Sequence, residues 1–294
     1  MSTYERYDTA AATVYDQTHA PVGVDLYASI LAAGSTPLDQ VELLDAGCGT
    51  GAYAAALAGR VGRVVGIDLS EAMLAMGRRR VCGQPVAERI TFQLGNIEAL
   101  PFPDNSFDAV MFNQVLHHLE SGDDPAYGAH ARAIIEAHRV LRPGGVLIAN
   151  VCTHEQLRRG FWYYDLIPQA VERSLRRCIP TERLDAMLAQ LGFILRGHIV
   201  PHDGVMQGPT YFDPWGPLDA NWRRTDSIWS LVKPEELAMA QARLWQLAHE
   251  HRIMNYLVER DAARRRTGQF TFFVAVRRAS AEGAATPLAK ISLS

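Results

Sequence analysis

The sequence has few cysteines and no long apolar run. Its four cysteines, in 294 residues, lie far apart and show no Cys-x-x-Cys spacing, which indicates neither a metal site nor a disulfide framework. No stretch approaches the ~18 consecutive apolar residues that a membrane-spanning helix needs. The polar N-terminus also lacks the apolar core of a signal peptide. These absences predict a cytoplasmic protein with no metal and no membrane partner.

A strong excess of charge is missing too. The chain has 29 basic and 32 acidic residues, a net charge of −3, which gives no electrostatic reason to expect nucleic acid as a partner. A hydrophobic content of 48% suffices for a full core, and the length allows one large domain with a sizeable insertion. We therefore expect a globular protein that acts on a small molecule.

One glycine-rich stretch has the pattern of a ligand site. The apolar run 41–44 ends in Asp45, glycines follow at alternate positions, and helix-forming residues occupy 52–57. This pattern predicts a buried strand that turns tightly into a helix, with a ligand at the helix N-terminus. Glycine permits both positive φ and close approach of a ligand to the backbone. The glycines are Gly47, Gly49 and Gly51.

The charge of Asp45 helps to identify the ligand. The turn also fits the dinucleotide pattern G-x-G-x-x-G/A, with Asp68 about twenty residues further on. However, Asp45 stands where a dinucleotide places its pyrophosphate, and two like charges at about 4 Å cost roughly 4 kcal/mol at a dielectric near 20. A cationic ligand, S-adenosylmethionine, fits better. A nicotinamide-dependent oxidoreductase, a non-catalytic cofactor-binding module and a bare turn remain the alternatives.

Five motifs occur in a fixed order, and together they resemble those of class I S-adenosylmethionine-dependent methyltransferases. The motif sequences are most similar to those of the ubiquinone/menaquinone-biosynthesis type. The resemblance covers about residues 10–200 and, more loosely, the last strand. It implies a small-molecule methyltransferase that releases S-adenosylhomocysteine. The motifs are DAGCGTG at 45–51, VGIDLS at 65–70, GNIEALPF at 95–102, FDAVMFNQVLHHL at 107–119 and RVLRPGGVLI at 139–148.

The order of elements predicts the fold and its domains. Strands alternate with helices, which is typical of a Rossmann-like, doubly wound α/β sheet that is mostly parallel and binds ligands at the carboxyl ends of its strands; the resemblance implies seven strands. We expect cofactor-covering helices in 1–40, a core in 41–200 with a helical lid at about 155–180, an insertion at 201–268, a last strand at 269–278 and a mobile tail at 279–294.

Cofactor contacts are expected at the strand ends. Asp68, at the end of a strand, can accept hydrogen bonds from ribose hydroxyls. The resemblance implies that Asn96 binds the adenine and that Asn113 and Gln114 lie beside the transferred methyl group. The expected set is Tyr15, Asp45, Gly47, Gly49, Gly51, Asp68, Leu69, Asn96, Ile97 and Asn113.

The methyl acceptor is expected in the two extra segments, 155–180 and 201–232, which are rich in aromatic residues. Such rings suit a small apolar acceptor, although they also fit a purely hydrophobic role. The expected pocket residues are Trp162, Tyr163, Tyr211, Trp215, Trp222, Trp229 and His118, and the candidate catalytic residues are His198, His202 and Asp226.

The chemistry expected there is O- or N-methylation in specialised metabolism, ahead of C-methylation of an isoprenoid or aromatic carbon. A long helix at 234–266 carries an apolar stripe, which predicts a subunit interface and hence a homo-oligomer.

Overall fold

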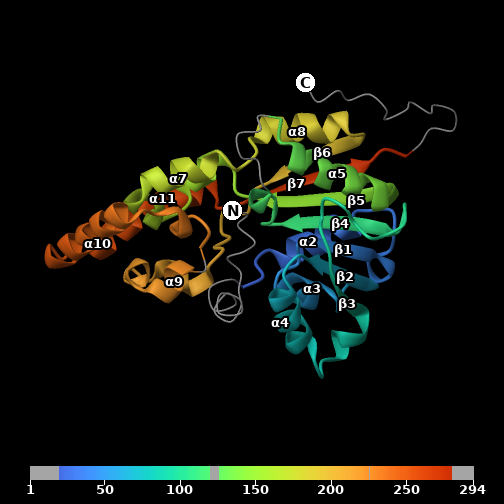
Figure 1. Ribbon diagram of the computed structural model, residues 1–294, viewed down its shortest axis with the longest axis horizontal. Coiled ribbons are helices and arrows are strands. Elements are labelled where there is room, and N and C mark those ends of the chain that lie inside the picture. The colour runs from blue at the N-terminus through green and yellow to red at the C-terminus, as the bar shows by residue number, and fades with distance from the viewer. Residues whose placement is uncertain (1–19, 120–125, 225, 280–294) are drawn as a thin grey trace.

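The computed structural model describes residues 20–119, 126–224 and 226–279. It has a twisted sheet with helices on both faces and a helical layer at one end, the end toward which the strands point (Figure 1). The strands are β1 (Glu42–Ala46), β2 (Arg63–Asp68), β3 (Ile90–Leu94), β4 (Phe107–Asn113), β5 (Leu141–Val151), β6 (Phe193–Ile199) and β7 (Thr271–Arg277). The helices are α2 (Val24–Ala32), α3 (Ala52–Leu57), α4 (Glu71–Val81), α5 (Gly128–Val140), α6 (His154–Arg159), α7 (Pro168–Leu175), α8 (Thr181–Gln190), α9 (Ala220–Arg224), α10 (Pro234–His249) and α11 (Ile253–Thr267).

The sheet has seven strands in the order β3-β2-β1-β4-β5-β7-β6. The first five are parallel, and β7 runs antiparallel between β5 and β6. The chain reverses its direction of winding between β1 and β4, which is where doubly wound sheets bind ligands. The predicted fold class is confirmed.

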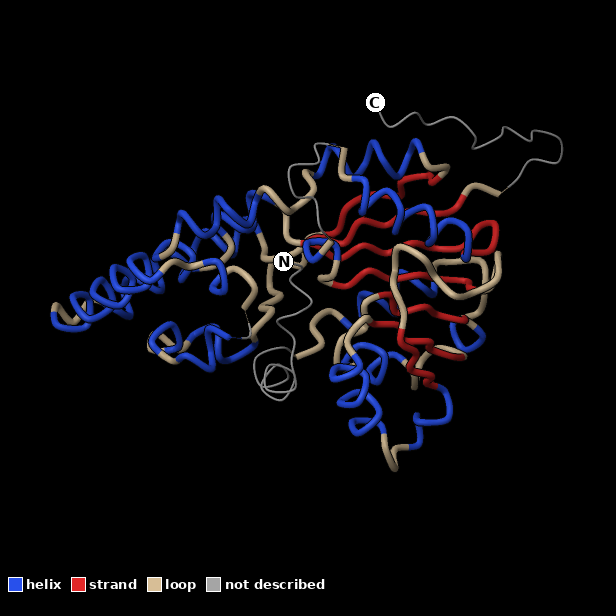
Figure 2. Tube along the Cα trace, in the orientation of Figure 1, coloured by secondary structure: helices blue, strands red, loops and turns tan. Residues whose placement is uncertain are grey.

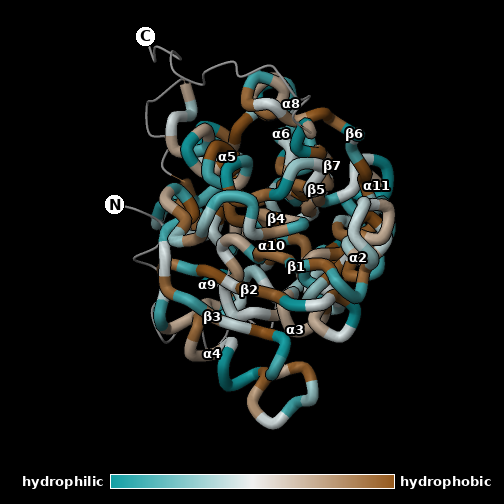
Figure 3. The backbone as a smooth tube through the Cα atoms, turned by 90° about the vertical axis from the view of Figure 1, so that its right-hand side faces the viewer, coloured by the Kyte–Doolittle hydropathy of each residue, from teal (hydrophilic) through white to brown (hydrophobic). Residues whose placement is uncertain are grey.

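Neighbouring strand residues face opposite sides of the sheet and pack into two cores. Leu43 and Ile148 lie in the core under α2 and α3, whereas Leu44 and Leu147 lie in the core under α5 and α8. Hydrophobic segments gather where the strands lie (Figure 3). Burial on both faces explains the nearly continuous apolar strands in the sequence.

The insertion and the lid pack together into a third core. The indole N–H of Trp162 donates to the carbonyl of Tyr211 over 2.6 Å, and the Tyr163 and Trp222 rings lie edge to face with centroids 4.8 Å apart. Figure 2 shows this layer, almost entirely helices and loops, beside the strands of the sheet. In the described parts of the chain, no helix is long and apolar enough to cross a membrane.

One local prediction was wrong. The helix expected over 234–266 is two helices, because His251 takes a left-handed φ of 55° and Arg252 N–H turns back to Leu247 O over 2.8 Å.

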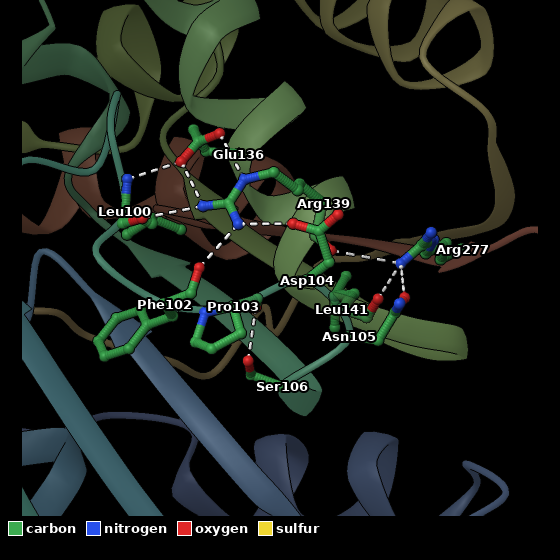
Figure 4. Close-up of polar contacts among 10 residues, drawn as sticks. All are labelled: Leu100, Phe102, Pro103, Asp104, Asn105, Ser106, Glu136, Arg139, Leu141 and Arg277. Carbon is green, nitrogen blue, oxygen red and sulfur yellow. Dashed lines mark hydrogen bonds and ion pairs between the residues drawn. The ribbon is translucent and has the colours of Figure 1, made fainter. Parts of the chain in front are cut away.

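An arginine on α5 holds the segment that leads from β3 to β4. The Arg139 guanidinium donates to the carbonyls of Leu100 (2.8 Å) and Phe102 (2.7 Å) and to the carboxylates of Asp104 and Glu136 (each 2.8 Å) (Figure 4). Glu136 also accepts the Leu100 N–H over 2.7 Å, so that the carboxylate and the guanidinium bind the same turn. This clamp joins two of the sequence motifs through side chains that lie outside the cofactor turn.

Candidate active site

A cavity lies at the carboxyl ends of β1, β2 and β4. It encloses about 880 Å³ of empty space, including the part open to solvent, and the glycine turn after β1 forms one wall. Gly47 has a φ of 83°, and a Cβ there would meet Val115 at 2.4 Å. Gly49 has a φ of 52°, and a Cβ there would meet nothing within 4 Å, so its backbone borders open space. The turn therefore leaves room for a ligand against the main chain.

Asp45 carries buried carboxylate oxygens without a partner. The side chain is 1% exposed and lines the cavity, and neither oxygen makes a hydrogen bond within the described residues. Burial, followed by the nearby Asp68 charge, raises the pKa of Asp45 to about 8. A buried carboxylate needs a positive partner, and the ammonium of S-adenosylmethionine would supply one. The residues present therefore fit this cofactor.

Asp68 holds the glycine turn from the end of β2. Its Oδ2 accepts the Gly49 N–H over 2.8 Å, and its Oδ1 accepts the Ser70 N–H over 2.9 Å. Burial raises the pKa of Asp68, and these backbone donors oppose the rise. The sequence suggested a ribose ligand; the structure adds a second role, because the carboxylate also fixes the turn. A carboxylate has about four acceptor sites, so two remain for hydroxyl groups.

The other expected cofactor residues divide into two groups. Asn113 lines the cavity, where its Oδ1 accepts from Tyr27 and Asn150, each over 2.8 Å. Four other residues do not line the cavity. Gly51 packs beside Phe92, and Leu69 is exposed. The Asn96 Oδ1 accepts the Glu98 N–H, and Ile97 is buried in the core. Their contacts with a cofactor stay predictions, and Tyr15 lies outside the described residues.

A second cavity adjoins the first, under the helical layer. It encloses about 840 Å³ of empty space and shares Gln114, His118 and Met206 with the cofactor cavity. Gln114 has a left-handed φ of 51°, a costly conformation for a residue with a side chain, which is typical of functional sites. Burial, with His117 and Arg177 nearby, lowers the pKa of His118 well below its usual range, so the imidazole is neutral near pH 7.

Polar groups in the second cavity come from distant segments. Asp226 is 8% exposed and accepts hydrogen bonds from Tyr164 Oη (2.8 Å) and from the N–H groups of Ile228 (2.8 Å) and Trp229 (3.2 Å). The Tyr163 hydroxyl is fully buried and makes no hydrogen bond to any described residue. The sequence drew attention to Tyr163, His118 and Asp226. Other lining residues carried no signal in isolation: Met206, Gln207, Cys152, Cys178 and Phe161.

Two predicted catalytic residues lie elsewhere. His198 is on the edge strand β6, where Nε2 lies 2.9 Å from Asp185 Oδ1, and it borders a separate groove on that side of the sheet. His202 is exposed, and its carbonyl accepts from Arg264 over 3.1 Å. Neither residue lines either cavity, so neither is placed to act as a base there. A sequence alone cannot show that β6 is an edge strand whose polar face points away from the site.

Most of the expected pocket aromatics are core residues instead. Those buried without lining the second cavity are Trp162, Tyr211, Trp222 and Trp229, and they pack with α10 and α11. Trp215 is 43% exposed, with its ring 5.7 Å from that of Trp245. The rings that line the cavity come from the lid: Phe161, Tyr163 and Tyr164. The hydrophobic role considered for the insertion thus accounts for Trp222 and Trp229.

The fold and the glycine turn define a doubly wound protein with a nucleoside-cofactor site. The family model described as a methyltransferase domain matches residues 44–149. A demethylmenaquinone methyltransferase of Symbiobacterium thermophilum is 41% identical over 129 residues, 42% of this chain and 48% of that protein. One from Clavibacter sepedonicus is 34% identical over 174 residues, 57% of this chain and 65% of that protein. The chain thus spans about half to two thirds of the length of these relatives.

A solved structure agrees over more of the chain. A putative methyltransferase from an antibiotic biosynthesis pathway of Anabaena variabilis superposes with a TM-score of 0.67 at 20% identity, covering 88% of this chain and 98% of that one. At this identity the likeness shows the fold alone. Residues 44–149 thus resemble a methyltransferase domain, and the described chain has the fold of the Anabaena protein.

Proposed function

We propose that the protein transfers a methyl group from S-adenosylmethionine to a small, largely apolar acceptor held in the second cavity. The border between the two cavities supports this best, since Gln114, His118 and Met206 line both. An acceptor enclosed by Phe161, Tyr163 and their neighbours would meet the cofactor only there. Holding the two reactants in contact supplies much of the rate enhancement of such reactions.

The residues of the chain bind and orient the two reactants, and one of them removes a proton from the acceptor. S-adenosylmethionine supplies an electrophilic methyl group on a sulfonium. Asp45 and Asp68 would hold its ammonium and its ribose, and Asn113 lines the same cavity. Neutral His118, at the border, can accept the proton that a hydroxyl or activated carbon of the acceptor loses.

Carbon is the methylated atom that the relatives favour. Those in bacteria such as Hydrogenovibrio crunogenus are named ubiquinone/menaquinone biosynthesis C-methyltransferases. We therefore place C-methylation ahead of O- or N-methylation, the reverse of the order expected from the sequence. The second cavity is compatible with all three, because the same base at the border serves carbon and oxygen acceptors.

The experiment has two stages. Calorimetry should show that S-adenosylhomocysteine binds and that NAD does not. Labelled S-adenosylmethionine is then supplied with phenols, amines and prenyl diphosphates, and the position of the label identifies the atom. His118→Gln should reduce transfer by about 10²–10⁴-fold while leaving S-adenosylhomocysteine affinity nearly unchanged. Failure to bind S-adenosylhomocysteine, or transfer confined to protein or nucleic acid, would refute the proposal.

We also propose that a second copy covers the outer face of α10 and α11. Four large apolar side chains of these two helices are more than half exposed: Met239, Trp245, Met254 and Val258. A second copy that covered them would remove this apolar surface from water. Light scattering should show a dimer at micromolar concentration, and Trp245→Glu should yield monomers. A wild-type monomer would contradict this.

A further inference from the structure

The second cavity contains polar atoms that the chain itself does not satisfy. The Tyr163 hydroxyl and the side-chain oxygen Oε1 of Gln207 have no hydrogen-bond partner within the described residues, and their side chains are 0% and 5% exposed. Both residues line the cavity. Buried polar atoms without partners are rare and costly in folded proteins. Two such atoms in one cavity therefore indicate a polar group on the ligand.

The charge in the cavity identifies that group. Asp226 has hydrogen-bond donors but no ion-pair partner among the described residues, and burial raises its pKa. Its three donors leave one of about four acceptor sites on the carboxylate. The ionised carboxylate of Asp226 and the side-chain oxygen of Gln207 can only accept hydrogen bonds, so the ligand has to donate. Tyr163 and Tyr164 also line the cavity, and the faces of aromatic rings attract cations.

We propose, on the basis of the methyl transfer proposed above, that the acceptor carries a protonated amine that binds beside Asp226, Gln207 and Tyr163. An ammonium offers three donors and a positive charge, which matches the two acceptors and the aromatic lining. Asp226 does not line the cofactor cavity, whereas His118 lines both. The amine therefore anchors the acceptor, and a different atom of the same molecule reaches the methyl group at the border.

Matched pairs of compounds test this. Tyramine and 4-propylphenol differ by an ammonium in place of a methyl group, as do tryptamine and 3-propylindole. Each is titrated into protein saturated with S-adenosylhomocysteine. The amine of each pair should bind at least about tenfold more tightly, the effect of one charge-assisted hydrogen bond. Equal or weaker binding by the amines, or no binding by any of the four, overturns the inference. Methyl transfer to neutral acceptors would then still stand.

Two aspartates provide a matched control. Asp226 Oδ1 accepts the N–H two residues ahead over 2.8 Å, and Asp219 does the same with Asn221, but Asp219 is exposed. Asp226→Asn should remove most of the preference for amines and keep S-adenosylhomocysteine affinity, whereas Asp219→Asn should change neither. A preference that survives Asp226→Asn would exclude this carboxylate as the anchor.

The Tyr163 hydroxyl gives an independent readout. Because it lacks a partner, Tyr163→Phe should leave the thermal stability of the free protein equal or higher. Affinity for tyramine should nevertheless fall severalfold. Lower stability with unchanged tyramine affinity would show that the hydroxyl serves the fold instead of the ligand.

Discussion

In the cofactor half of the site, most lining residues follow the ends of β1, β2 and β4 within sequence motifs, whereas in the acceptor half many come from the lid and from two parts of the insertion. The first half depends on backbone conformation: left-handed glycines and N–H groups held by Asp68. The second depends on the packing of large side chains behind the lining. Substitutions should therefore damage the two halves in different ways.

The largest effect is expected from the core of the acceptor half. Trp162 is 1% exposed and donates to Tyr211 O, so Trp162→Ala should lower the free energy of unfolding by about 3–5 kcal/mol, measured by urea denaturation. Leu94→Ala is the control, because that side chain is 54% exposed, and it should cost under about 1 kcal/mol. A loss of S-adenosylhomocysteine affinity in folded Trp162→Ala protein would show that the cofactor half depends on the packing of the acceptor half.

Removal of the Arg139 clamp should affect the cofactor half. Arg139→Ala leaves two carbonyls and Glu136 without their donor, and we expect a loss of about 2–3 kcal/mol in urea denaturation. Arg132→Ala breaks only an exposed ion pair with Glu98 and should cost less than about 1 kcal/mol. Equal losses in the two variants would show that the clamp carries no special weight.

Asp68 allows the two roles of one carboxylate to be separated. Asp68→Ala should weaken S-adenosylhomocysteine binding by about 1.5–3 kcal/mol, measured by calorimetry, because hydroxyls lose a charged acceptor. Asp68→Asn keeps one oxygen for a backbone N–H and should lose less. Glu88→Ala, an exposed acid, serves as the control. Unchanged affinity in folded Asp68→Ala protein would disprove the ribose assignment.

The smallest expected effect is the change in cofactor affinity per pH unit. With its pKa at about 8, Asp45 is protonated in the free protein at pH 7, while a bound ammonium needs the carboxylate. Binding should therefore release a proton, and affinity should rise up to tenfold per pH unit, about 1.4 kcal/mol, from pH 6 to pH 8. Calorimetry in two buffers of different ionisation enthalpy measures the proton, and Asp45→Asn should abolish its release. Equal affinity at pH 6 and pH 8 would contradict this.

The two halves also differ in how far their sequence predicts them. The helix at 52–57 and the strand end at Asp68 matched α3 and β2, since apolar runs, glycines and acids mark each turn locally. The acceptor half offered only aromatic composition. Whether Trp222 packs in a core and Tyr163 lines a cavity depends on contacts between residues far apart in sequence. These two rings contact each other although they are 59 residues apart. Likewise, His198 looked suitable by residue type and was placed outside the site by its edge strand.

The insertion begins and ends at one place in the sheet. It leaves β6 after Ile199 and returns at Thr271, and Ile199 pairs with Phe272 on the adjacent strand. Because both ends sit on one antiparallel pair, the whole segment can be exchanged for another without changing the register of any strand. Replacing this one segment would change the insertion's share of the acceptor cavity, and of the described residues that line the cofactor cavity it would exchange only Met206.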